Sequence, residues 1–428
     1  MSSELIAVLD SRKTGRVVRD PRGRLSFTYD ESWRHSRDAY PLSLSMPLAL
    51  ATHGQARVEA FLWGLLPDSE GTIERWAAQS GVSPRNVFGL IRAKGEDCAG
   101  AVQFVTPERL DLFLGPDSGE VQWLDESAIA ERLQMLRRDH SAWRTQTDTG
   151  QFSLAGAQPK TAFLFDKGRW GVPSGRLPTT HILKPPTSDL AGRIENEHFC
   201  LELARLLGLP VIDSNIAHFQ DETAIVIRRY DRVQTGDTWR RVHQEDLCQA
   251  LGLFPTKKYQ NDGGPSISRI VELLRTNSSN PEEDVRTFID AVAYSWLIAG
   301  TDAHAKNYAL LIGAGGQVRL APLYDLMSAL SYPDSLDLHR VKLAMKVGGE
   351  YRLRYIGLNH WRKAAAGIRL EPDALLRRLD DFAAQLPDYA STVRQRMRDQ
   401  GLTNSIIGQL ADAIATRASV CRSALRVA

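Results

Sequence analysis

The chain has 428 residues and a formal net charge of +2, with ordinary shares of hydrophobic and charged residues. This composition is typical of a soluble globular protein of two or three subdomains, and it excludes a general polyanion-binding character. Four scattered cysteines form no metal-binding or disulfide spacing, and no apolar run is long enough to span a membrane. We therefore expect a cytoplasmic protein with no membrane partner.

The first part of the chain, residues 1–140, predicts a small antiparallel sheet followed by helices. Apolar runs indicate strands at 4–10, 16–18 and 25–29, with turns at Thr14-Gly15 and at Pro21-Arg22-Gly23. Helical patterns follow at residues 58–66, 72–79, 83–91 and 124–138, and a strand pattern covers 101–105. Nothing in this part carries recognisable chemistry by itself, so we interpret it as an extra N-terminal subdomain.

The second part, residues 141–232, predicts a sheet that binds a nucleotide. Small residues at Ala155, Gly156 and Ala157 would let backbone N–H groups approach an anion, just before a strand at 161–165. The stretch matches neither the Walker pattern nor G-x-G-x-x-G, and a tight turn entering a hairpin is the alternative. A second strand, 180–184, ends in Lys184, which is either a phosphate-contacting lysine as in kinases or an exposed edge lysine.

The same part continues with a helix and a hairpin. The helix covers residues 195–207, and its early Glu195 and Glu197 either stabilise the helix dipole or include a partner for Lys184. A hairpin follows with strands at 217–220 and 223–227. It leads into residues 228–232, where a kinase hinge would contact adenine through backbone groups.

The third part, residues 233–428, is predicted to be a mostly helical lobe, with helices at 244–251, 267–274, 284–298 and from 358 onward. A hairpin of strands 308–312 and 318–321 interrupts it. Because a hairpin folds its ends back on each other, Asp325 should return close to Asn307. Asp302 would then lie with them at one edge of a small sheet.

An Asp, an Asn five residues later and a second Asp after a hairpin form the protein-kinase arrangement. The first Asp accepts the hydroxyl proton, while the Asn and the last Asp hold Mg²⁺ against the phosphates of ATP, since Mg²⁺ prefers oxygen ligands. Separately, Asp302 would be read as a turn cap and Asp325 as a loop residue. Together they predict a two-lobed, protein-kinase-like α+β fold, with active residues where a sheet-rich N-terminal lobe meets a helical C-terminal lobe.

A series of ordered motifs runs along the chain, at residues 65–68, 95–101, 153–160, 181–184, 195–197, 229–232, 244–246, 257–259, 262–265, 301–307 and 324–325. On these motifs, nearly the whole chain resembles the HipA family of serine/threonine kinases, the toxins of bacterial HipBA toxin–antitoxin modules. The resemblance departs at Pro159 and Arg228, where acidic residues are familiar. The Arg228 difference puts the details of adenine recognition in doubt.

The resemblance implies a role for each candidate site residue. Asp302 would be the catalytic base with His304 beside the transferred phosphate, and Asn307 and Asp325 would hold Mg²⁺. Ser153 would be the autophosphorylation site. Its modification would inactivate the kinase, because a dianionic group there is repelled by ATP phosphates and carries its loop outward. The remaining residues would bind ATP: Leu154, Ala155, Gly156, Ala157, Gln158, Lys160, Lys184, Arg228 and Tyr230.

The resemblance also implies partners. Family targets include aminoacyl-tRNA synthetases, of which the glutamyl enzyme is the most familiar, and a HipB-like helix-turn-helix antitoxin would link the toxin to operator DNA. Two alternatives stay open, a small-molecule kinase of similar shape and an inactive kinase-like co-repressor. The presence of Lys184, Asp302, Asn307 and Asp325 argues against the inactive module.

Overall fold

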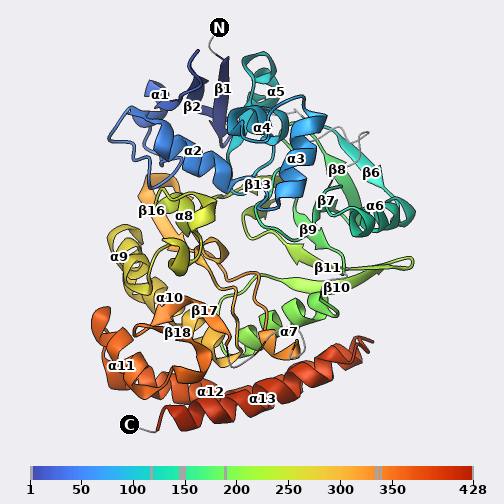
Figure 1. The fold of residues 1–428 in the computed structure, drawn as a ribbon. Helices are drawn as coiled ribbons and strands as arrows, with labels where there is room; N and C mark the ends of the chain where they lie inside the picture. The colour runs from blue at the N-terminus through green and yellow to red at the C-terminus, as the bar shows by residue number, and fades with distance from the viewer. Residues whose placement is uncertain are drawn as a thin grey trace. The chain divides into compact units, whose positions relative to one another are not determined.

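The protein is described by a computed structural model that covers residues 3–115, 119–143, 151–187, 190–332, 337 and 340–426. The chain divides into two compact units (Figure 1). The first unit comprises residues 1–185, 217–255 and 309–321, and the second comprises residues 186–216, 256–308 and 322–428. Most strands belong to the first unit and the longest helices to the second, as the predicted α+β class requires. The finer division at residues 140 and 232 stays a prediction.

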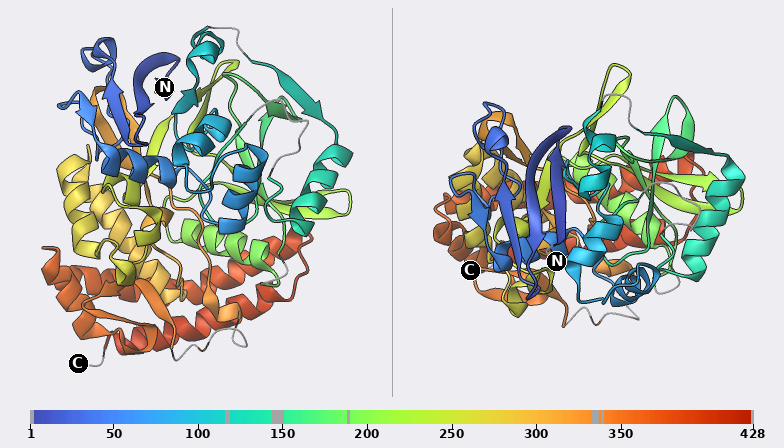
Figure 2. Two further views of the ribbon diagram at one scale, coloured as in Figure 1. Left: turned by 45° about the horizontal axis from the view of Figure 1, so that its top comes forward. Right: turned by 90° about the horizontal axis from the view of Figure 1, so that it is seen from above.

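The first unit opens with a five-stranded antiparallel sheet in the order β4-β3-β2-β1-β5. In Figure 2, β1 and β2 lie side by side at the N-terminus. The strands are β1 (Ser3–Leu9), β2 (Arg12–Arg19), β3 (Leu25–Tyr29), β4 (Thr52–His53) and β5 (Gln103–Val105).

The predicted turn at Thr14-Gly15 is wrong. The chain reverses at Asp10 and Ser11, whose φ values are 49° and 57°, and tight hairpin turns require such positive angles. Thr14 is instead the extra residue of a β-bulge, because Ala7 pairs with Gly15 while Val8 pairs with Lys13. Threonine followed by glycine is a turn signal, but here it marks a bulge inside a strand.

Short helices surround the sheets of the first unit: α1 (Glu31–Arg34), α2 (Gln55–Gly64), α3 (Glu70–Gln79), α4 (Val87–Lys94), α5 (Asp111–Leu114), α6 (Glu126–Arg138) and α8 (Leu247–Ala250). Side-chain caps mark where five of them begin, α1, α3, α4, α6 and α8. Ser69 accepts from the Thr72 N–H at the start of α3, and Asn86 accepts from the Gly89 N–H at the start of α4. The predicted start of α4 at Ser83 was therefore too early.

A six-stranded sheet in the order β10-β11-β9-β7-β8-β6 forms the centre of the first unit. Its strands are β6 (Val121–Leu124), β7 (Thr161–Asp166), β8 (Arg169–Pro173), β9 (His181–Lys184), β10 (Ser214–Phe219) and β11 (Glu222–Arg228). Helix α6 covers one face, where its Ile129 and Leu133 share a buried cluster with Phe163, Leu183 and Val226. β9 is antiparallel to both neighbours, so Lys184 lies at the end of an interior strand.

Two smaller sheets complete the first unit. β12 (Arg232–Thr235) pairs with β13 (Thr238–Arg241), and a three-stranded sheet contains β14 (His243–Asp246), β15 (Ala309–Gly313) and β16 (Gln317–Leu320). The β15–β16 pairing confirms the predicted hairpin. The predicted helix at 244–251 is wrong in its first half, because Gln244 pairs with Leu311 in the sheet and Asp246 caps the short α8 that follows.

The second unit is built mainly from helices: α7 (Arg193–Leu206), α9 (Ile267–Asn277), α10 (Pro281–Leu297), α11 (Leu358–Gly367), α12 (Pro372–Asp399) and α13 (Ile406–Ala424). α12 and α13 pack side by side (Figure 1). The buried α10 is linked to α7 by the Tyr294 hydroxyl, which donates to the Cys200 carbonyl at 2.7 Å. A small hairpin of β17 (Lys342–Val347) and β18 (Glu350–Arg352) was not predicted. No described helix has the length and apolar content of a membrane span.

Candidate active site

The loop that carries Asp302 begins where α10 ends. Ala299 adopts a φ of 54°, and the Gly300 N–H donates back to the Ser295 carbonyl at 2.7 Å, which stops the helix. The Asp302 carbonyl then accepts the His304 N–H at 2.7 Å and the Asn307 Nδ2 at 2.7 Å. These bonds fix a tight loop, and they direct the amide oxygen of Asn307 away from that carbonyl.

Tyr259 contacts both candidate catalytic side chains in the second unit. Its hydroxyl donates to Asp302 Oδ1, and its ring meets the His304 imidazole edge-to-face with centroids 5.0 Å apart. The Lys258 carbonyl accepts the Ala305 N–H at 3.1 Å and holds the two segments together. The Asp302 side chain is 61% exposed, whereas that of His304 is only 5% exposed. Asp302 thus presents a positioned carboxylate to solvent.

Asp325 follows the β15–β16 hairpin in a left-handed conformation, with a φ of 56°. Asp tolerates this conformation better than most residues, and such positions occur often in functional loops. The hydroxyl of its neighbour Tyr324 donates to the Lys306 carbonyl at 2.7 Å. The hairpin therefore brings the segment before Asp325 to the segment before Asn307, as the predicted return of the chain requires.

Asn196 of α7 fixes the chain beyond Asp325. Its buried amide donates to the Ser328 carbonyl at 2.8 Å and accepts the Ser328 N–H at 2.9 Å, and the Ser328 hydroxyl donates to the Ile298 carbonyl at 2.6 Å. Sequence reasoning assigned no role to Asn196 or Tyr259, although both lie in motifs that carried the family resemblance. A single hydrogen-bonding residue gives no spacing signal that could have identified it.

Asn307 and Asp325 supply an amide oxygen and a carboxylate, both hard ligands that suit Mg²⁺. Among the residues that the structure describes, no group of three or more His, Cys, Asp or Glu side chains could hold a metal ion. A magnesium ion at a phosphate site needs only one or two protein ligands, because it keeps waters and binds phosphate oxygens. The two residues therefore fit Mg²⁺ and do not fit a dedicated all-protein metal cage.

The segment around Ser153 belongs to the first unit and is held by its N-terminal part. The buried Ser153 hydroxyl donates to the Leu65 carbonyl at 2.8 Å, and the Ser153 N–H donates to the Asp97 carbonyl at 2.9 Å. The Gly156 carbonyl accepts the Asp68 N–H at 3.1 Å. The candidate autophosphorylation site is therefore fixed by main-chain groups of residues 65–68 and 97.

The candidate phosphate loop needs its glycine. Gly156 has a φ of 103°, and a Cβ there would lie 2.5 Å from Lys160 Nζ. Lys160 donates to the Ala155 carbonyl at 2.5 Å and lies over the Trp143 ring, so in this conformation it supports the loop from within. Leu154 is buried, while Ala157 is exposed.

Gln158 is 7% exposed, and neither its amide nitrogen nor its amide oxygen has a hydrogen-bond partner among the described residues. Such a group is costly to bury unpaired, because it has lost its hydration. A ligand that brings polar atoms to Gln158 would remove this cost. The loop 154–158 therefore fits a polar ligand.

The other candidate ATP contacts also lie in the first unit. Lys184 is buried at the end of β9, and Arg228 is exposed opposite His181. Burial, reinforced by the Arg228 charge, lowers the pKa of His181 to about 4, so its imidazole is neutral at pH 7. The Tyr230 hydroxyl donates to the Gln244 amide oxygen. Any contact of Arg228 or Tyr230 with adenine stays a prediction.

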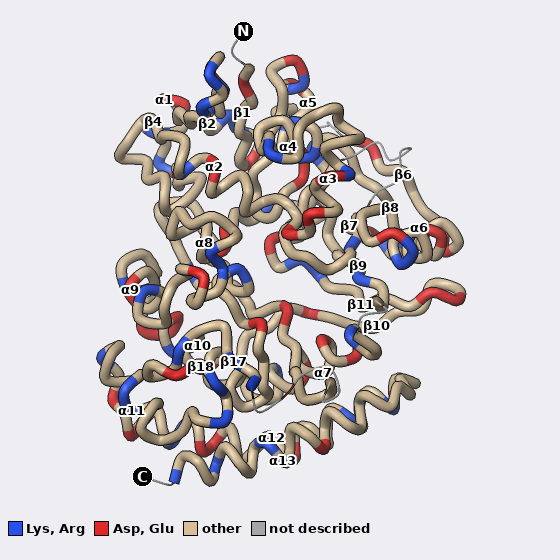
Figure 3. Tube along the Cα trace, in the orientation of Figure 1, with Lys and Arg blue, Asp and Glu red and all other residues tan. Residues whose placement is uncertain are grey.

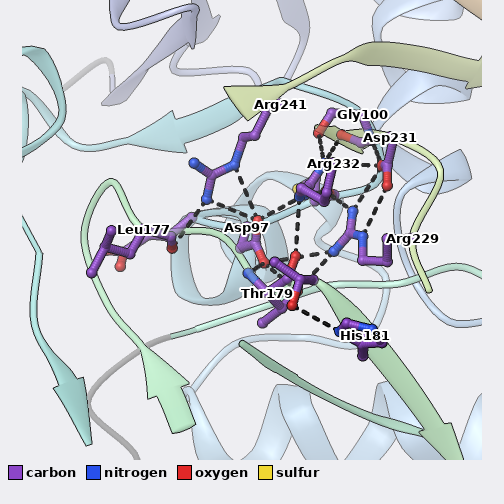
Figure 4. A network of polar contacts seen from close by, with 12 residues as sticks. Asp97, Gly100, Leu177, Thr179, His181, Arg229, Asp231, Arg232 and Arg241 are labelled. Atoms are coloured by element: carbon purple, nitrogen blue, oxygen red, sulfur yellow. Dashed lines mark hydrogen bonds and ion pairs between the residues drawn. The ribbon is translucent and has the colours of Figure 1, made fainter. Parts of the chain in front are cut away.

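A buried network of Asp97, Arg229, Asp231, Arg232 and Arg241, the Asp97 network, supports this region (Figure 4). Asp97 Oδ1 accepts from Arg232 at 2.9 Å and from Arg241 at 2.9 Å. Asp97 Oδ2 accepts the Thr179 hydroxyl at 2.7 Å. Burial alone would raise the pKa of Asp97, but the three guanidinium groups lower it well below its usual value.

Comparison with known proteins identifies the family. The sequence profile of the HipA-like C-terminal domain matches residues 152–390, and that of the HipA N-terminal domain matches residues 5–105. The protein Y4mE of Sinorhizobium fredii, named only provisionally as a kinase, is 33% identical over 416 residues, which cover 96% of this chain and 97% of that protein. The serine/threonine-protein kinase toxin HipA of Shewanella oneidensis is 29% identical over 382 residues, which cover 85% and 83% of the two chains.

A solved structure agrees with these sequence matches. HipA of Shewanella oneidensis, in a complex with HipB and its operator DNA, superimposes with a TM-score of 0.82 at 25% identity, over 98% of this chain and 99% of that one. The C-terminal profile includes every candidate site residue from Ser153 to Asp325. The chain therefore belongs to the HipA family of kinases.

Proposed function

We propose that this chain is an ATP-dependent serine/threonine protein kinase that acts in the cytoplasm as the toxin of a toxin–antitoxin system. The observation that carries the proposal is the arrangement at Asp302, an exposed carboxylate fixed by Tyr259 and joined through its carbonyl to Asn307. A catalytic base must be positioned and must also be accessible to its substrate. Asp302 meets both conditions.

Asp302 accepts the proton of a substrate serine or threonine hydroxyl as that oxygen bonds to the γ-phosphorus and the bond to ADP breaks. Because Tyr259 donates to Oδ1, Oδ2 is the atom available for the proton. His304 stands beside this carboxylate, with its Nε2 4.0 Å from Oδ1. Asn307 and Asp325 would hold Mg²⁺, which neutralises phosphate charge when bound.

The ATP phosphates would be bound by residues 154–158, Lys160 and Lys184, with Arg228 and Tyr230 at the hinge. The partnerless amide of Gln158 and the positive φ of Gly156 support a loop built to meet a ligand. In the present conformation Lys160 donates to a loop carbonyl, so it would act first by holding the loop in shape.

Autophosphorylation at Ser153 would inactivate the kinase. The Ser153 hydroxyl is buried and already donates to the Leu65 carbonyl, so the segment must leave this place before the hydroxyl can accept a phosphoryl group. A phosphate added there could not return, because a dianion next to a carbonyl oxygen is repelled and has lost its hydration.

The proposed substrate rests on the family resemblance, and the proposed partner on a solved relative. A translation protein such as an aminoacyl-tRNA synthetase, of which the glutamyl enzyme is the first candidate, would be the target. A HipB-like helix-turn-helix antitoxin would bind the chain and connect it to operator DNA. The complex of the Shewanella oneidensis protein with HipB and its operator DNA supports this partner.

The test is phosphate transfer from labelled ATP with Mg²⁺, alone and in a bacterial lysate, with sites mapped by mass spectrometry. Asp302→Asn should lower transfer about 10²–10⁴-fold while unfolding at the same temperature as the wild type. Ser153→Ala should keep transfer to the lysate target but lose self-inactivation.

Full activity of Asp302→Asn would contradict the mechanism. Label at a residue other than Ser153 would contradict the autophosphorylation site. ATP binding without transfer to any acceptor would favour the co-repressor module, and transfer to small molecules alone would favour a small-molecule kinase.

A further inference from the structure

A cluster of basic residues lies next to Asp302 within the second unit. The β17–β18 hairpin contacts the turn that carries Tyr259, because the Lys346 N–H donates to Gln260 Oε1 at 2.8 Å. Gln260 follows Tyr259 directly, and the Tyr259 hydroxyl contacts Asp302. One face of the hairpin is therefore connected to the candidate catalytic base through two neighbouring residues.

The basic strip is defined as residues 257–262, β17, β18 and the short helix η7 (Leu353–Tyr355), with residues 348–349 between the two strands. It has six basic residues against two acidic ones, whereas the whole chain has 53 against 51. Figure 3 shows the basic positions along β17 and β18. Its charged residues are Lys257, Lys258, Asp262, Lys342, Lys346, Glu350, Arg352 and Arg354.

The strip presents its charges on an ordered backbone. Lys342 and Lys346 are the exposed residues of β17, whereas Leu343, Ala344, Met345 and Val347 are buried. β17 is irregular between these residues, because Lys342 pairs with Arg352 but Val347 pairs with Glu350. At about 3.3 Å per residue, the two lysine Cα atoms lie at most roughly 13 Å apart. That spacing can meet acidic side chains a few residues apart on one extended segment.

Most of the positive charge is not neutralised within the protein. Glu350 is engaged by Arg352 at 3.3 Å and by two backbone N–H groups. Within the described part of the chain, no acidic group lies within ion-pair distance of Lys257, Lys342, Lys346 or Arg354. The field of these four cations is therefore directed at solvent.

Each of the three tyrosines of the strip has a cation over its ring, and at Tyr259 this is Lys258 at 5.7 Å. Lys346 lies over Tyr351 at 5.0 Å, and both Arg352 and Arg354 lie 4.4 Å from the Tyr355 ring centroid. Proteins that bind single-stranded nucleic acid without sequence preference stack bases on aromatic rings. Here the rings orient guanidinium and ammonium groups, which suits carboxylates better than bases.

We propose that the basic strip binds an acidic segment of the protein substrate and so places a nearby serine or threonine hydroxyl at Asp302. This inference deepens the proposed kinase function and rests on it. The substrate class is a protein with Glu or Asp residues spaced along an extended segment next to the phosphate acceptor.

The test uses the full-length chain and fluorescein-labelled 12-residue peptides that contain one serine, flanked either by four Glu or by four Gln. Lys342→Gln/Lys346→Gln is compared with Arg396→Gln/Arg398→Gln, which removes two exposed charges from α12 of the same unit. Fluorescence anisotropy at low salt should show that the Glu peptide binds the wild type roughly tenfold more tightly than the Gln peptide. The β17 variant should lose this preference and the α12 variant should keep it.

Phosphate transfer to Ser153 is measured in the same preparations, so the two proposals fail separately. If a preparation that labels Ser153 bound both peptides equally, the proposed role of the basic strip would be wrong and the proposed kinase activity would still hold. The same conclusion would follow if the β17 variant and the α12 variant lost peptide binding equally. If a single-stranded RNA of equal charge bound more tightly than the Glu peptide, and Lys342→Gln/Lys346→Gln lost that binding, the ligand of the strip would be nucleic acid and the acidic-peptide proposal would be wrong. Normal peptide discrimination without any phosphate transfer would support the surface and contradict the kinase.

Discussion

Two aspartates in this protein accept hydrogen bonds from side chains but differ in burial, with opposite consequences. Asp97 in the first unit is buried, and both of its carboxylate oxygens are used by arginines and Thr179. Asp302 in the second unit is 61% exposed and, among the residues that the structure describes, has one side-chain donor, Tyr259, at one oxygen. A buried carboxylate needs a full set of partners, because it has lost its hydration. An exposed one can keep an oxygen available for chemistry.

The comparison separates stability from activity. Removal of Asp97 should unfold the protein more easily, whereas removal of Asp302 should leave the fold intact and stop phosphate transfer. Motif content alone would not make this distinction, because both residues lie in segments that carry the family resemblance. The burial of each aspartate and the number of its hydrogen-bond partners distinguish the residue needed for stability from the one needed for activity.

The largest expected effect on stability is that of Asp97→Ala. The substitution would leave the guanidinium groups of Arg229, Arg232 and Arg241 buried with one acid, Asp231, so we expect a loss of about 3–5 kcal/mol in the free energy of unfolding. Urea denaturation of the wild type, Asp97→Ala and Asp302→Ala measures the change in the free energy of unfolding for each variant. If Asp97→Ala lost less than about 1 kcal/mol in the free energy of unfolding, or if Asp302→Ala lost more than Asp97→Ala, the assignment of Asp97 to stability and Asp302 to activity would be wrong.

Glu245 gives an intermediate case, a buried carboxyl group that accepts a hydrogen bond but has no cationic partner in the described part of the chain. Its Oε1 accepts the Leu44 N–H at 2.8 Å, and burial raises its pKa from 4.5 to about 8. The folded state therefore holds a proton that the unfolded state releases, and stability should fall as pH rises from about 4.5 to about 8.

Glu245→Gln keeps the acceptor and removes the titration. We expect the variant to be more stable than wild type by on the order of 3 kcal/mol at pH 9 and by little at pH 4. Melting temperatures of both proteins measured between pH 4 and pH 9 test this. Glu350→Gln is the matched control, since Glu350 is only half-buried and its pKa is lowered to about 2 by hydrogen bonds that it accepts from Arg352 and Tyr351. Parallel pH curves for wild type and Glu245→Gln would refute the prediction.

The sequence predicted the strand–turn–strand around the candidate site because its signals are local. Apolar runs flank the glycines at 313–316, and they fold as the β15–β16 hairpin. Strand β14 was mistaken for helix because its four residues, His-Gln-Glu-Asp, carry no apolar alternation, and its partner β15 lies more than 60 residues away in the chain. The β17–β18 hairpin was missed for a similar reason, since Gly348-Gly349 follows only one short apolar run.

The candidate site was predictable only in part. The residue types and the spacing of Asp302, Asn307 and Asp325 identified them in the sequence. Contacts between residues close in the chain bring their segments together. Tyr259 and Asn196 act by hydrogen bonds to residues 43 and 132 positions away. Such long-range contacts leave no trace in local sequence patterns, so only the fold reveals them.

The smallest expected effect, and the most specific one, is that of Tyr259→Phe. The substitution removes the hydroxyl that donates to Asp302 Oδ1 and keeps the ring that packs against His304. One hydrogen bond to a charged group at a half-exposed site is worth about 1.4 kcal/mol, so kcat should fall about tenfold. KM for ATP and the melting temperature should stay close to those of wild type, because the hydroxyl positions only the base.

The control is Tyr389→Phe on α12, where no such contact exists among the described residues, and it should change neither kcat nor the melting temperature. A change in the melting temperature without a change in kcat would mean that Tyr259 belongs with the Asp97 network as a structural residue. A fall in kcat alone would place it in the active site.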